Sequence, residues 1–316
     1  MIDRFSDRVY QLVYQWYTYQ RVGGFPLQRV TLLGAGGKMG TRITNNLVKS
    51  AYGDSTQYVE VSSEGQDRLK AKGLRVSTAE EAIPGADLVI LALPDRLIGK
   101  LSPAVVQLMK PGAMVVLLDP AAAYLGQLPI RHEVSFFVTH PCHTPVFNDE
   151  VDAEARQDYF GGVKAKQAIV CALGSGPEAD YARGEDLAKV MYGPILRSHR
   201  ITVDQMAILE PAMAETVACT LSTILRDSLA QAIKAGVPAE AARDFMLGHI
   251  HIGLSIALGQ VGFNFSDACL VAIDYGRASL IKEGWEKVFD HKSIKEQVDV
   301  MLHPEKLTKV LQAIKG

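Results

Sequence analysis

The chain has 316 residues, of which 48% are hydrophobic, enough to bury a sizeable core and typical of two domains. Lys plus Arg (33) nearly balance Asp plus Glu (35), and this excludes the strongly charged surface that would indicate a nucleic-acid or membrane partner. The four cysteines lie far apart and no apolar run reaches the length of a membrane span, which favours a cytoplasmic protein with isolated thiols.

Residues 1–28 form a predicted N-terminal extension that contains many of the aromatic side chains. The segment has neither the continuous apolar core nor the small-residue cleavage site of a signal peptide. Tyr10, Val13, Tyr14 and Tyr17 would share one face of a helix. The pattern leaves three alternatives open: an arm that binds a partner, an arm that packs on the chain, and an extension that results only from an earlier start codon.

A strand, a glycine-rich turn and a helix are predicted over residues 29–48. Such a turn presents backbone N–H groups at a helix N-terminus to a pyrophosphate. The spacing reads as G-x-x-G-x-x-G through Gly34, Gly37 and Gly40, because Met39 occupies the last glycine position of the plain G-x-G-x-x-G pattern. The residues predicted to bind a dinucleotide here are Gly34, Ala35, Gly36, Gly37, Lys38 and Met39.

A second apolar run ends near Glu60, twenty residues beyond Gly40. A carboxylate at the end of the second strand accepts hydrogen bonds from both hydroxyls of the adenosine ribose and repels a 2′-phosphate. Glu60 therefore favours NAD over NADP as the cofactor. The alternative for Glu60 is a solvated glutamate on an edge strand. The carboxylate that binds the ribose would then be that of Glu64 or Asp67.

The apolar run at 86–95 is typical of a parallel strand buried on both faces. Ligands bind outside the carboxyl ends of such strands, so Leu93, Pro94 and Asp95 are expected to border the nicotinamide half of the cofactor. Asp95 could equally serve as the cap of the next helix. With a further helix and a strand at 114–120, the pattern predicts a doubly wound parallel sheet, an α/β Rossmann domain over residues 29–202.

Two histidines follow the next apolar strand, in the segment VSFFVTHPCHTPVFNDE at 134–150. His140 and His143 flank Pro141 and Cys142, and the prolines of this loop stiffen it. A histidine at this position can remove a proton from a substrate hydroxyl or ligate a divalent metal. One lone histidine would more often bond to nearby backbone, but the pair favours function. No motif supports Cys142 as a nucleophile, and a small packed thiol is expected.

A long helix is predicted over residues 202–235, opened by a capping box. Apolar residues cover nearly its whole circumference, so it is expected to be buried on all sides. Glu210 and Glu215 stand within it, roughly 140° apart on an α-helix. A buried carboxylate has to be paired, protonated or bound to a metal. Pro211 should kink the helix and re-aim Glu210, so Glu210 is the predicted catalytic or metal-binding residue and Glu215 a buried ion-pair partner.

Residues 203–316 are predicted to form an all-helical C-terminal domain that binds the substrate and makes a homodimer. His249 and His251 lie two apart on a helix, so they point to different sides. His249 is the candidate for the cleft, against the alternative of a satisfied core histidine.

The segments GAGGKMG, LALPD, THPCHTPVFNDE, KQAIVCAL, ILEP and DFMLGH together resemble the D-apionate oxidoisomerase family, of the 6-phosphogluconate-dehydrogenase-like class, over residues 29–280. The resemblance implies NAD-dependent oxidation of the branched sugar acid D-apionate, coupled to migration of the carbon skeleton, giving 3-oxo-isoapionate. This pairing is similar to ketol-acid reductoisomerase run in reverse, which depends on a divalent metal, and it implies His140 and Glu210 as metal ligands. His251 and Gly253 replace an expected asparagine and glutamate, which leaves the exact substrate open.

Two other functions fit the same motifs. One is a simple NAD-dependent hydroxyacid or prephenate-like dehydrogenase without rearrangement, which needs only the acid–base role of a histidine. Its activity would survive a strong chelator. The other is a non-catalytic NAD-binding sensor, which would bind NAD and turn over no sugar acid.

Overall fold

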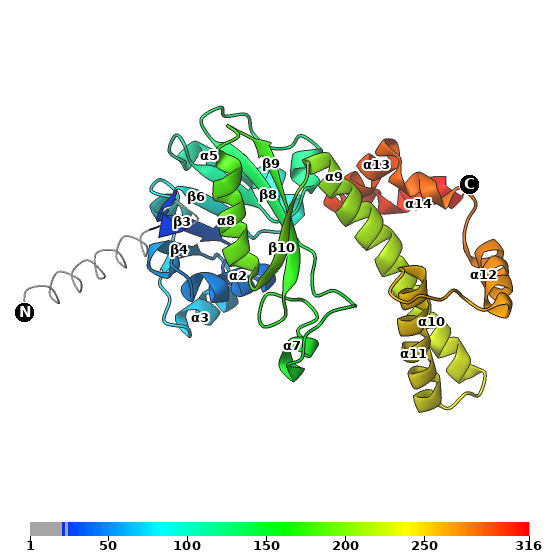
Figure 1. Ribbon diagram of the computed structural model, residues 1–316. Helices are drawn as coiled ribbons and strands as arrows, with labels where there is room; N and C mark the ends of the chain where they lie inside the picture. The colour runs from blue at the N-terminus through cyan, green and yellow to red at the C-terminus, as the bar shows by residue number, and fades with distance from the viewer. Residues whose placement is uncertain (1–20, 23–24, 316) are drawn as a thin grey trace, which may run out of the picture. The chain divides into compact units, whose positions relative to one another are not determined.

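The computed structural model describes residues 21–22 and 25–315 (Figure 1). Most of the predicted N-terminal extension, including its proposed helical face, lies outside the described residues. The chain forms two compact units. The first unit comprises the residues up to 207 and those from 298 onward, and the second unit comprises residues 208–297. A short antiparallel pair, β1 (Arg21–Val22) and β2 (Phe25–Pro26), precedes the main sheet.

The first unit is built on an eight-stranded sheet in the order β10-β9-β8-β7-β6-β3-β4-β5. Its strands are β3 (Val30–Leu33), β4 (Thr56–Val59), β5 (Val76–Ser77), β6 (Leu88–Leu91), β7 (Met114–Leu117), β8 (Ser135–Pro141), β9 (Gln167–Ser175) and β10 (Ile195–Arg200). All neighbouring strands are parallel except β8 and β9. The strand order reverses beside β3, which pairs with both β4 and β6, and this switch point is where such sheets bind ligands. The predicted doubly wound α/β fold is confirmed.

The core of the first unit lies on its central strands. Every residue of β3, β6 and β7 is buried, as expected for apolar strands covered on both faces. Helices α2 (Lys38–Val48) and α8 (Asp180–Tyr192) supply side chains to the same core. The other helices before residue 203 are α3 (Ser63–Lys70), α4 (Ala79–Ala82), α5 (Asp95–Leu108), α6 (Ala121–Tyr124) and α7 (Ala153–Gln157), with a 3₁₀ turn η1 (Gly53–Ser55).

A continuous helix runs from α9 (Val203–Ala207) through a π-helical segment η2 (Ile208–Cys219) into α10 (Thr220–Lys234). The Thr202 backbone N–H donates to the Gln205 side chain at 2.9 Å, and the Gln205 N–H donates to the Thr202 hydroxyl at 3.1 Å. The predicted capping box is therefore confirmed. The remaining helices are α11 (Ala239–Ala257), α12 (Asp267–Leu280), η3 (Trp285–Phe289), α13 (His291–Leu302), η4 (Pro304–Lys306) and α14 (Leu307–Lys315).

The prediction that this long helix is buried on all sides is wrong for the single chain. In the most apolar 18-residue stretch of the helix Val203–Lys234, only 11% of the residues are buried. Met213 and Leu221 are 48% and 44% exposed. The helix is also long and apolar enough to cross a membrane by length and composition, which the sequence analysis overlooked. Within the part of the chain that the structure describes, many of the apolar side chains of this helix stay exposed, because apolar composition alone does not ensure that a surface is covered.

The two glutamates of this helix are also placed differently from the expectation. Glu210 is half-buried, whereas Glu215 is exposed, so the predicted burial of Glu215 is wrong. Both lie in η2, where hydrogen bonds run from residue i to i+5. Residues five apart are then about one turn apart, so the α-helical separation of roughly 140° does not apply.

Candidate active site

The glycine turn after β3 is held by its own close packing. Gly34 N–H and Ala35 N–H both donate to the Val59 carbonyl at the end of β4, at 2.9 and 3.1 Å. Gly34 has φ +76°, and a Cβ on it would lie 2.3 Å from the Ala92 carbonyl oxygen. A Cβ on Gly40 would lie 1.9 Å from the Gly34 carbonyl oxygen. Only glycine therefore allows α2 to begin this close to the strand ends.

Glu60 closes the other side of the turn. Its carboxylate accepts hydrogen bonds from the N–H groups of Gly36 at 2.9 Å, Val61 at 2.9 Å and Ser62 at 2.8 Å. Burial alone would raise the pKa of the Glu60 carboxyl, but these bonds and one from the Ser62 hydroxyl hold that pKa below its ordinary value. Glu60 is thus a charged group directed at the glycine turn, which is the arrangement expected for a ribose acceptor.

The turn after β6 leads directly into α5. Pro94 precedes the helix and makes no side-chain cap, so Asp95 is the first helical residue and not the cap. Solvent reaches this side chain, yet the protein atoms around the carboxyl remove part of its hydration. This desolvation, followed by repulsion from Asp119, raises the pKa of Asp95 to about 6, and His140 opposes the shift. Asp95, Asp119 and His140 therefore share one electrostatic environment at the carboxyl ends of the strands.

His140 is the last residue but one of β8 and lies beside the end of β7. Its Nδ1 is 2.8 Å from the Leu118 carbonyl oxygen, which can only accept a hydrogen bond. Nδ1 therefore carries the proton, and Nε2 is left as a ligand or proton acceptor. A backbone acceptor on the second ring nitrogen is typical of metal-binding histidines.

Asp119 is a site residue that the sequence analysis missed. It follows β7, and the register of β7 and β8 pairs Leu117 with Val138, which brings residue 119 close to residue 140. The signal was a carboxylate two residues beyond a buried strand, in MVVLLDP. It could have been recognised only by assuming that β7 and β8 are neighbours.

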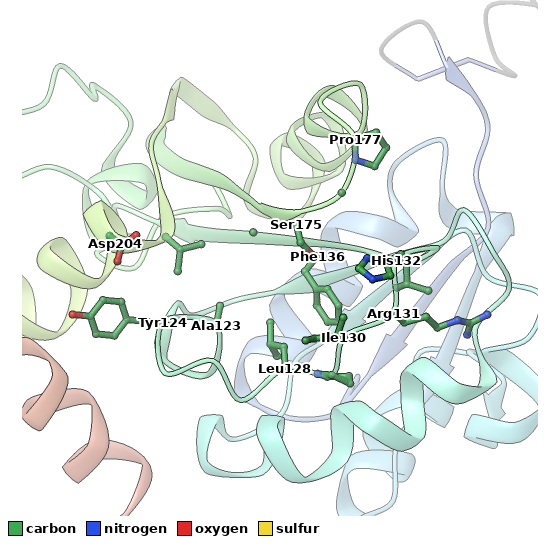
Figure 2. Close-up of a pocket in the computed structure, with 15 residues that line it drawn as sticks. Ala123, Tyr124, Leu128, Ile130, Arg131, His132, Phe136, Ser175, Pro177 and Asp204 are labelled. Carbon is green, nitrogen blue, oxygen red and sulfur yellow. The ribbon is translucent and has the colours of Figure 1, made fainter.

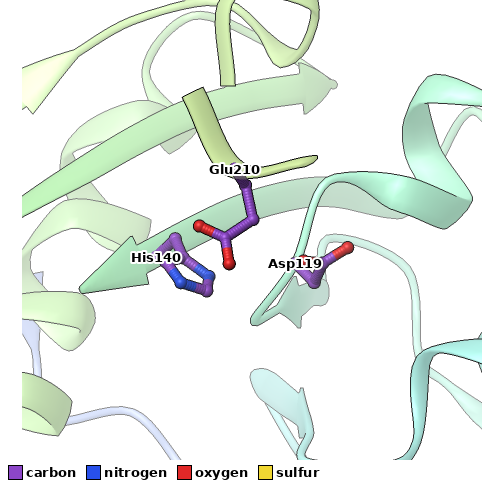
Figure 3. A group of neighbouring side chains, drawn as sticks. All are labelled: Asp119, His140 and Glu210. Atoms are coloured by element: carbon purple, nitrogen blue, oxygen red, sulfur yellow. The ribbon is translucent and has the colours of Figure 1, made fainter. Parts of the chain in front are cut away.

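Asp119, His140 and Glu210 each offer one ligand atom, and these atoms all lie within 4.8 Å of one another (Figure 3). Ala207 is the last residue of the N-terminal part of the first unit. Glu210 follows it by less than one turn of a continuous helix. Met206 and Ala207 are fully buried, so the start of this helix is fixed in the first unit. Metal–ligand distances are roughly 2.0–2.6 Å, so two ligands of one ion lie at most about 5 Å apart. The three side chains have the spacing and the chemistry of a metal site.

His143 is held in an unusual backbone conformation, with φ +62°, which is uncommon for residues other than glycine. Its Nδ1 is 2.9 Å from the Phe160 carbonyl oxygen, and its ring centroid is 6.1 Å from that of His140. Burial lowers the pKa of His143, and the Phe160 hydrogen bond opposes the shift. Cys142, between the histidines, is exposed and not buried as expected, since it follows the last residue of β8.

His249 lies on α11 in the second unit and is exposed. Its Nδ1 is 2.8 Å from the Phe245 carbonyl of its own helix, and its ring stacks on Phe245 at 3.8 Å between centroids. Its own helix therefore satisfies one ring nitrogen. A role of His249 in the cleft stays a prediction.

A cavity of about 540 Å³ lies elsewhere in the first unit (Figure 2). It is lined by α6, the loop at 128–134, the end of β9 and the start of α9. Desolvation and the nearby Asp204 carboxylate raise the pKa of Tyr124 at one end of it. None of the predicted site residues, all of which the structure describes, lines this cavity.

Comparison with known proteins places this geometry in a family. Residues 148–302 match the family described as phosphogluconate dehydrogenase (decarboxylating) C-term. A protein of Cupriavidus necator named D-apionate oxidoisomerase is 48% identical over 272 residues, which span 86% of this chain and 98% of that protein. One of the same name from Rhizobium rhizogenes is 48% identical over 84% of this chain and 96% of its own length.

A solved structure agrees with these relatives. The crystal structure of a semialdehyde dehydrogenase NAD-binding protein from Cupriavidus necator, in complex with calcium and NAD, has 48% identity and a TM-score of 0.84. The match covers 87% of this chain and 99% of that one. The fold and the glycine turn define an NAD-dependent oxidoreductase with a Rossmann domain and a helical C-terminal part. Within that class, the chain belongs to the D-apionate oxidoisomerase family.

Proposed function

We propose that the chain oxidises D-apionate with NAD⁺ while the carbon skeleton rearranges, giving 3-oxo-isoapionate, NADH and a proton. The observation that carries the proposal is the convergence of Asp119, His140 and Glu210 at the carboxyl ends of β7 and β8, on the edge of the sheet that also carries the glycine turn. A simple dehydrogenase needs one acid–base group and no such cluster of ligands. The name of the relatives, D-apionate oxidoisomerase, supports the substrate.

The residues of the glycine turn fit NAD⁺. Gly37 carries no side-chain cap, so the N-terminus of α2 is available to the pyrophosphate. Glu60 would accept hydrogen bonds from the adenosine ribose, and Leu93, Pro94 and Asp95 would border the nicotinamide. The nicotinamide, when bound, accepts the hydride that leaves the substrate.

The donor set of the candidate metal site, two carboxylates and one imidazole, fits a divalent cation. When bound there, such an ion would hold the substrate carboxylate and an adjacent hydroxyl and lower the pKa of that hydroxyl. Asp119 and Glu210 would supply negative charge that balances the ion. The Leu118 carbonyl would keep the His140 ring in the tautomer that ligates through Nε2.

His143 is the proposed base. Its Nδ1 faces a carbonyl oxygen that can only accept, so Nε2 carries the lone pair that takes the substrate proton. Burial lowers its pKa, which keeps the ring neutral and able to accept a proton near pH 7.

The experiment that tests this function is identification of the product. The protein is incubated with NAD⁺, Mg²⁺ and D-apionate, NADH is followed by absorbance, and the carbon skeleton of the product is determined by NMR. A rearranged 3-oxo acid supports the proposal. Oxidation without rearrangement, or turnover that survives a strong chelator, would identify the simple dehydrogenase instead.

Single substitutions test the metal ligands. His140→Ala and Glu210→Gln are expected to abolish Mg²⁺-dependent turnover and to weaken Mn²⁺ binding, measured by calorimetry. His132→Ala and Glu240→Gln, which change an exposed histidine and an exposed glutamate outside the cluster, are the matched controls. If the first two variants keep both turnover and metal dependence, the assignment of ligands is wrong.

We also propose that a second copy of the chain covers the apolar sides of the second unit. Large apolar side chains on and beside α11 and α12 are 58–77% exposed: Phe245, Leu258, Phe263, Val271, Tyr275 and Leu280. A groove of about 410 Å³ between η2, α10 and residues 277–288 adds to this surface. Exposed apolar area on this scale indicates association. Light scattering is expected to give a dimer, and Val271→Glu a monomer. Binding to lipid vesicles by a monomeric wild type would show that the surface meets a membrane instead.

A further inference from the structure

The connection between β8 and β9, residues 142–166, packs closely against the cofactor helix α2. The Asn46 side-chain amide donates to the carbonyl oxygens of Gly162 at 3.1 Å, Met191 at 2.9 Å and Gly193 at 3.2 Å. The space left where the two segments meet is only about 10 Å³. No ligand fits there, so this contact fixes the two segments relative to each other and is not a binding site.

Arg42 makes a second attachment between the same segments. Its Nη2 donates to the Gly161 carbonyl oxygen and lies 3.6 Å from the Asp158 carboxylate. Its guanidinium carbon is 4.1 Å from the centroid of the Phe160 ring. Lys38, the first residue of α2, has its ammonium 5.6 Å from the same ring. The Phe160 ring therefore contacts two cations of the helix that receives the pyrophosphate.

Phe160 also contacts His143, through both its ring and its backbone carbonyl. The ring centroids are 4.4 Å apart, with the rings inclined at 64°. The Phe160 carbonyl oxygen is 2.9 Å from His143 Nδ1 and fixes the proton on that nitrogen. A residue with φ +62° keeps this conformation only where its surroundings impose it, and Phe160 supplies two of the contacts.

We infer that Phe160 is a positioning residue that couples the cofactor helix to His143. Its ring holds Arg42 and Lys38 at the start of α2, and its carbonyl keeps the His143 ring in the tautomer with a lone pair on Nε2. The effect on turnover rests on the proposed function of His143 as the base. The effects on NADH affinity and on the His143 tautomer rest on the contacts alone.

Two substitutions of Phe160 and a neighbouring control test the inference. Phe160→Leu removes the aromatic ring, Phe160→Tyr keeps it, and Tyr159→Leu changes an aromatic side chain that is 79% exposed. Loss of the ring is expected to raise the dissociation constant of NADH about 3- to 30-fold, the range that a cation–π contact contributes. At saturating NAD⁺ it is expected to lower kcat about tenfold, because His143 is no longer held. Phe160→Tyr and Tyr159→Leu should match the wild type.

Two spectroscopic readouts separate positioning from general loss of structure. NADH binding is measured by fluorescence, and the tautomer of His143 by long-range ¹H–¹⁵N NMR. The wild type should show the proton on Nδ1. Phe160→Leu keeps the backbone carbonyl but loses the ring that packs on the imidazole, so the His143 ring should turn away from the carbonyl part of the time and show a mixture of tautomers. If the wild type binds NADH but does not oxidise D-apionate, the proposed function fails, while these two measurements still decide the inference.

A double-mutant comparison tests the coupling itself. In the double variant Arg42→Leu/Phe160→Leu the loss of NADH affinity should be smaller than the product of the two single losses, because both substitutions remove the same Arg42–Phe160 contact. Independent, multiplicative effects would overturn the coupling. So would Phe160→Leu with wild-type affinity and kcat, or Phe160→Tyr as impaired as Phe160→Leu. If Phe160→Leu does not fold, the test uses Arg42→Leu, which changes a partly exposed side chain. An Arg42→Leu protein with the NADH affinity and the His143 tautomer of the wild type would then overturn the inference.

Discussion

Substitution of Gly40 by alanine tests the close packing of the cofactor turn. A Cβ on Gly40 would lie 1.9 Å from the Gly34 carbonyl oxygen and 2.8 Å from the carbonyl carbons of Gly34 and Ala35. These neighbours are backbone atoms, so no side chain can rotate away. The start of α2 and the end of β3 have to separate by about 1.5 Å to reach an ordinary contact.

The size of the effect follows from two opposing contributions. Overpacking against backbone costs about 3 kcal/mol, and the better helix propensity of alanine returns about 1 kcal/mol. The expected net loss is about 2 kcal/mol, or a decrease in Tm of about 3 °C for a chain of this size. The affinity for NADH should fall at least tenfold, because the displaced N–H groups are those that would meet the pyrophosphate.

Urea denaturation followed by circular dichroism and NADH fluorescence titration measure the two effects. Gly248→Ala is the matched control, because Gly248 is also helical and no atom lies within 4 Å of its Cβ position. It should leave NADH affinity unchanged and stabilise the protein by about 0.5–1 kcal/mol. A Gly40→Ala protein with wild-type stability and affinity would refute the assignment of this turn as a rigid cofactor cradle.

Three further outcomes follow from single carboxylates. Glu60→Ala should lower kcat/KM with NAD⁺ about 10- to 100-fold and raise the ratio of NADP⁺ to NAD⁺ activity, whereas Glu64→Ala, at an exposed position, should change neither. Asp119→Asn should weaken Mn²⁺ binding by tenfold or more in calorimetry, and Asp54→Asn in an exposed 3₁₀ turn should not. The Asp158 carboxylate accepts three backbone N–H bonds, which together with Arg42 outweigh burial and lower its pKa from 3.8. A pKa that is lower in the native than in the unfolded state stabilises the protein above pH 3.8, and this contribution disappears as the pH falls through the native value. The stability lost in Asp158→Asn, about 2 kcal/mol at pH 7 by urea denaturation, should therefore shrink at pH 3, and an undiminished loss there would contradict the assigned bonds.

Much of the sheet and of the cofactor turn could be predicted from the sequence. The buried strands have no alternation of polar residues, and the glycines at 34, 37 and 40 stand at a spacing that is typical of a strand–turn–helix. The capping box of Thr202 and Gln205 is a local signal, and it occurs in the structure. Local patterns of this kind do not depend on what lies next to them in space.

The rest depends on contacts between distant parts of the sequence. Asp119 and His140 converge because β7 and β8 are neighbours, which no property of either segment reveals. The angle between Glu210 and Glu215 was misjudged because helical periodicity assumes 3.6 residues per turn, whereas both lie in a π-helical segment. The exposed sides of the long helix were predicted as buried because apolar composition indicates that a surface is covered and does not say by which chain.

The antiparallel direction of β9 has a consequence for how this enzyme family can diversify. A parallel strand after β8 would oblige the chain to cross to the opposite edge of the sheet and return through a helix. Because β9 runs against β8, the chain leaves and re-enters the sheet at the same edge. Residues 142–166 are thus a replaceable insert on the ligand side, and altering their length or sequence leaves the strand order and its crossovers intact. Selection for a new sugar acid can act on that insert as long as the contacts of residues 158–162 with α2 are kept.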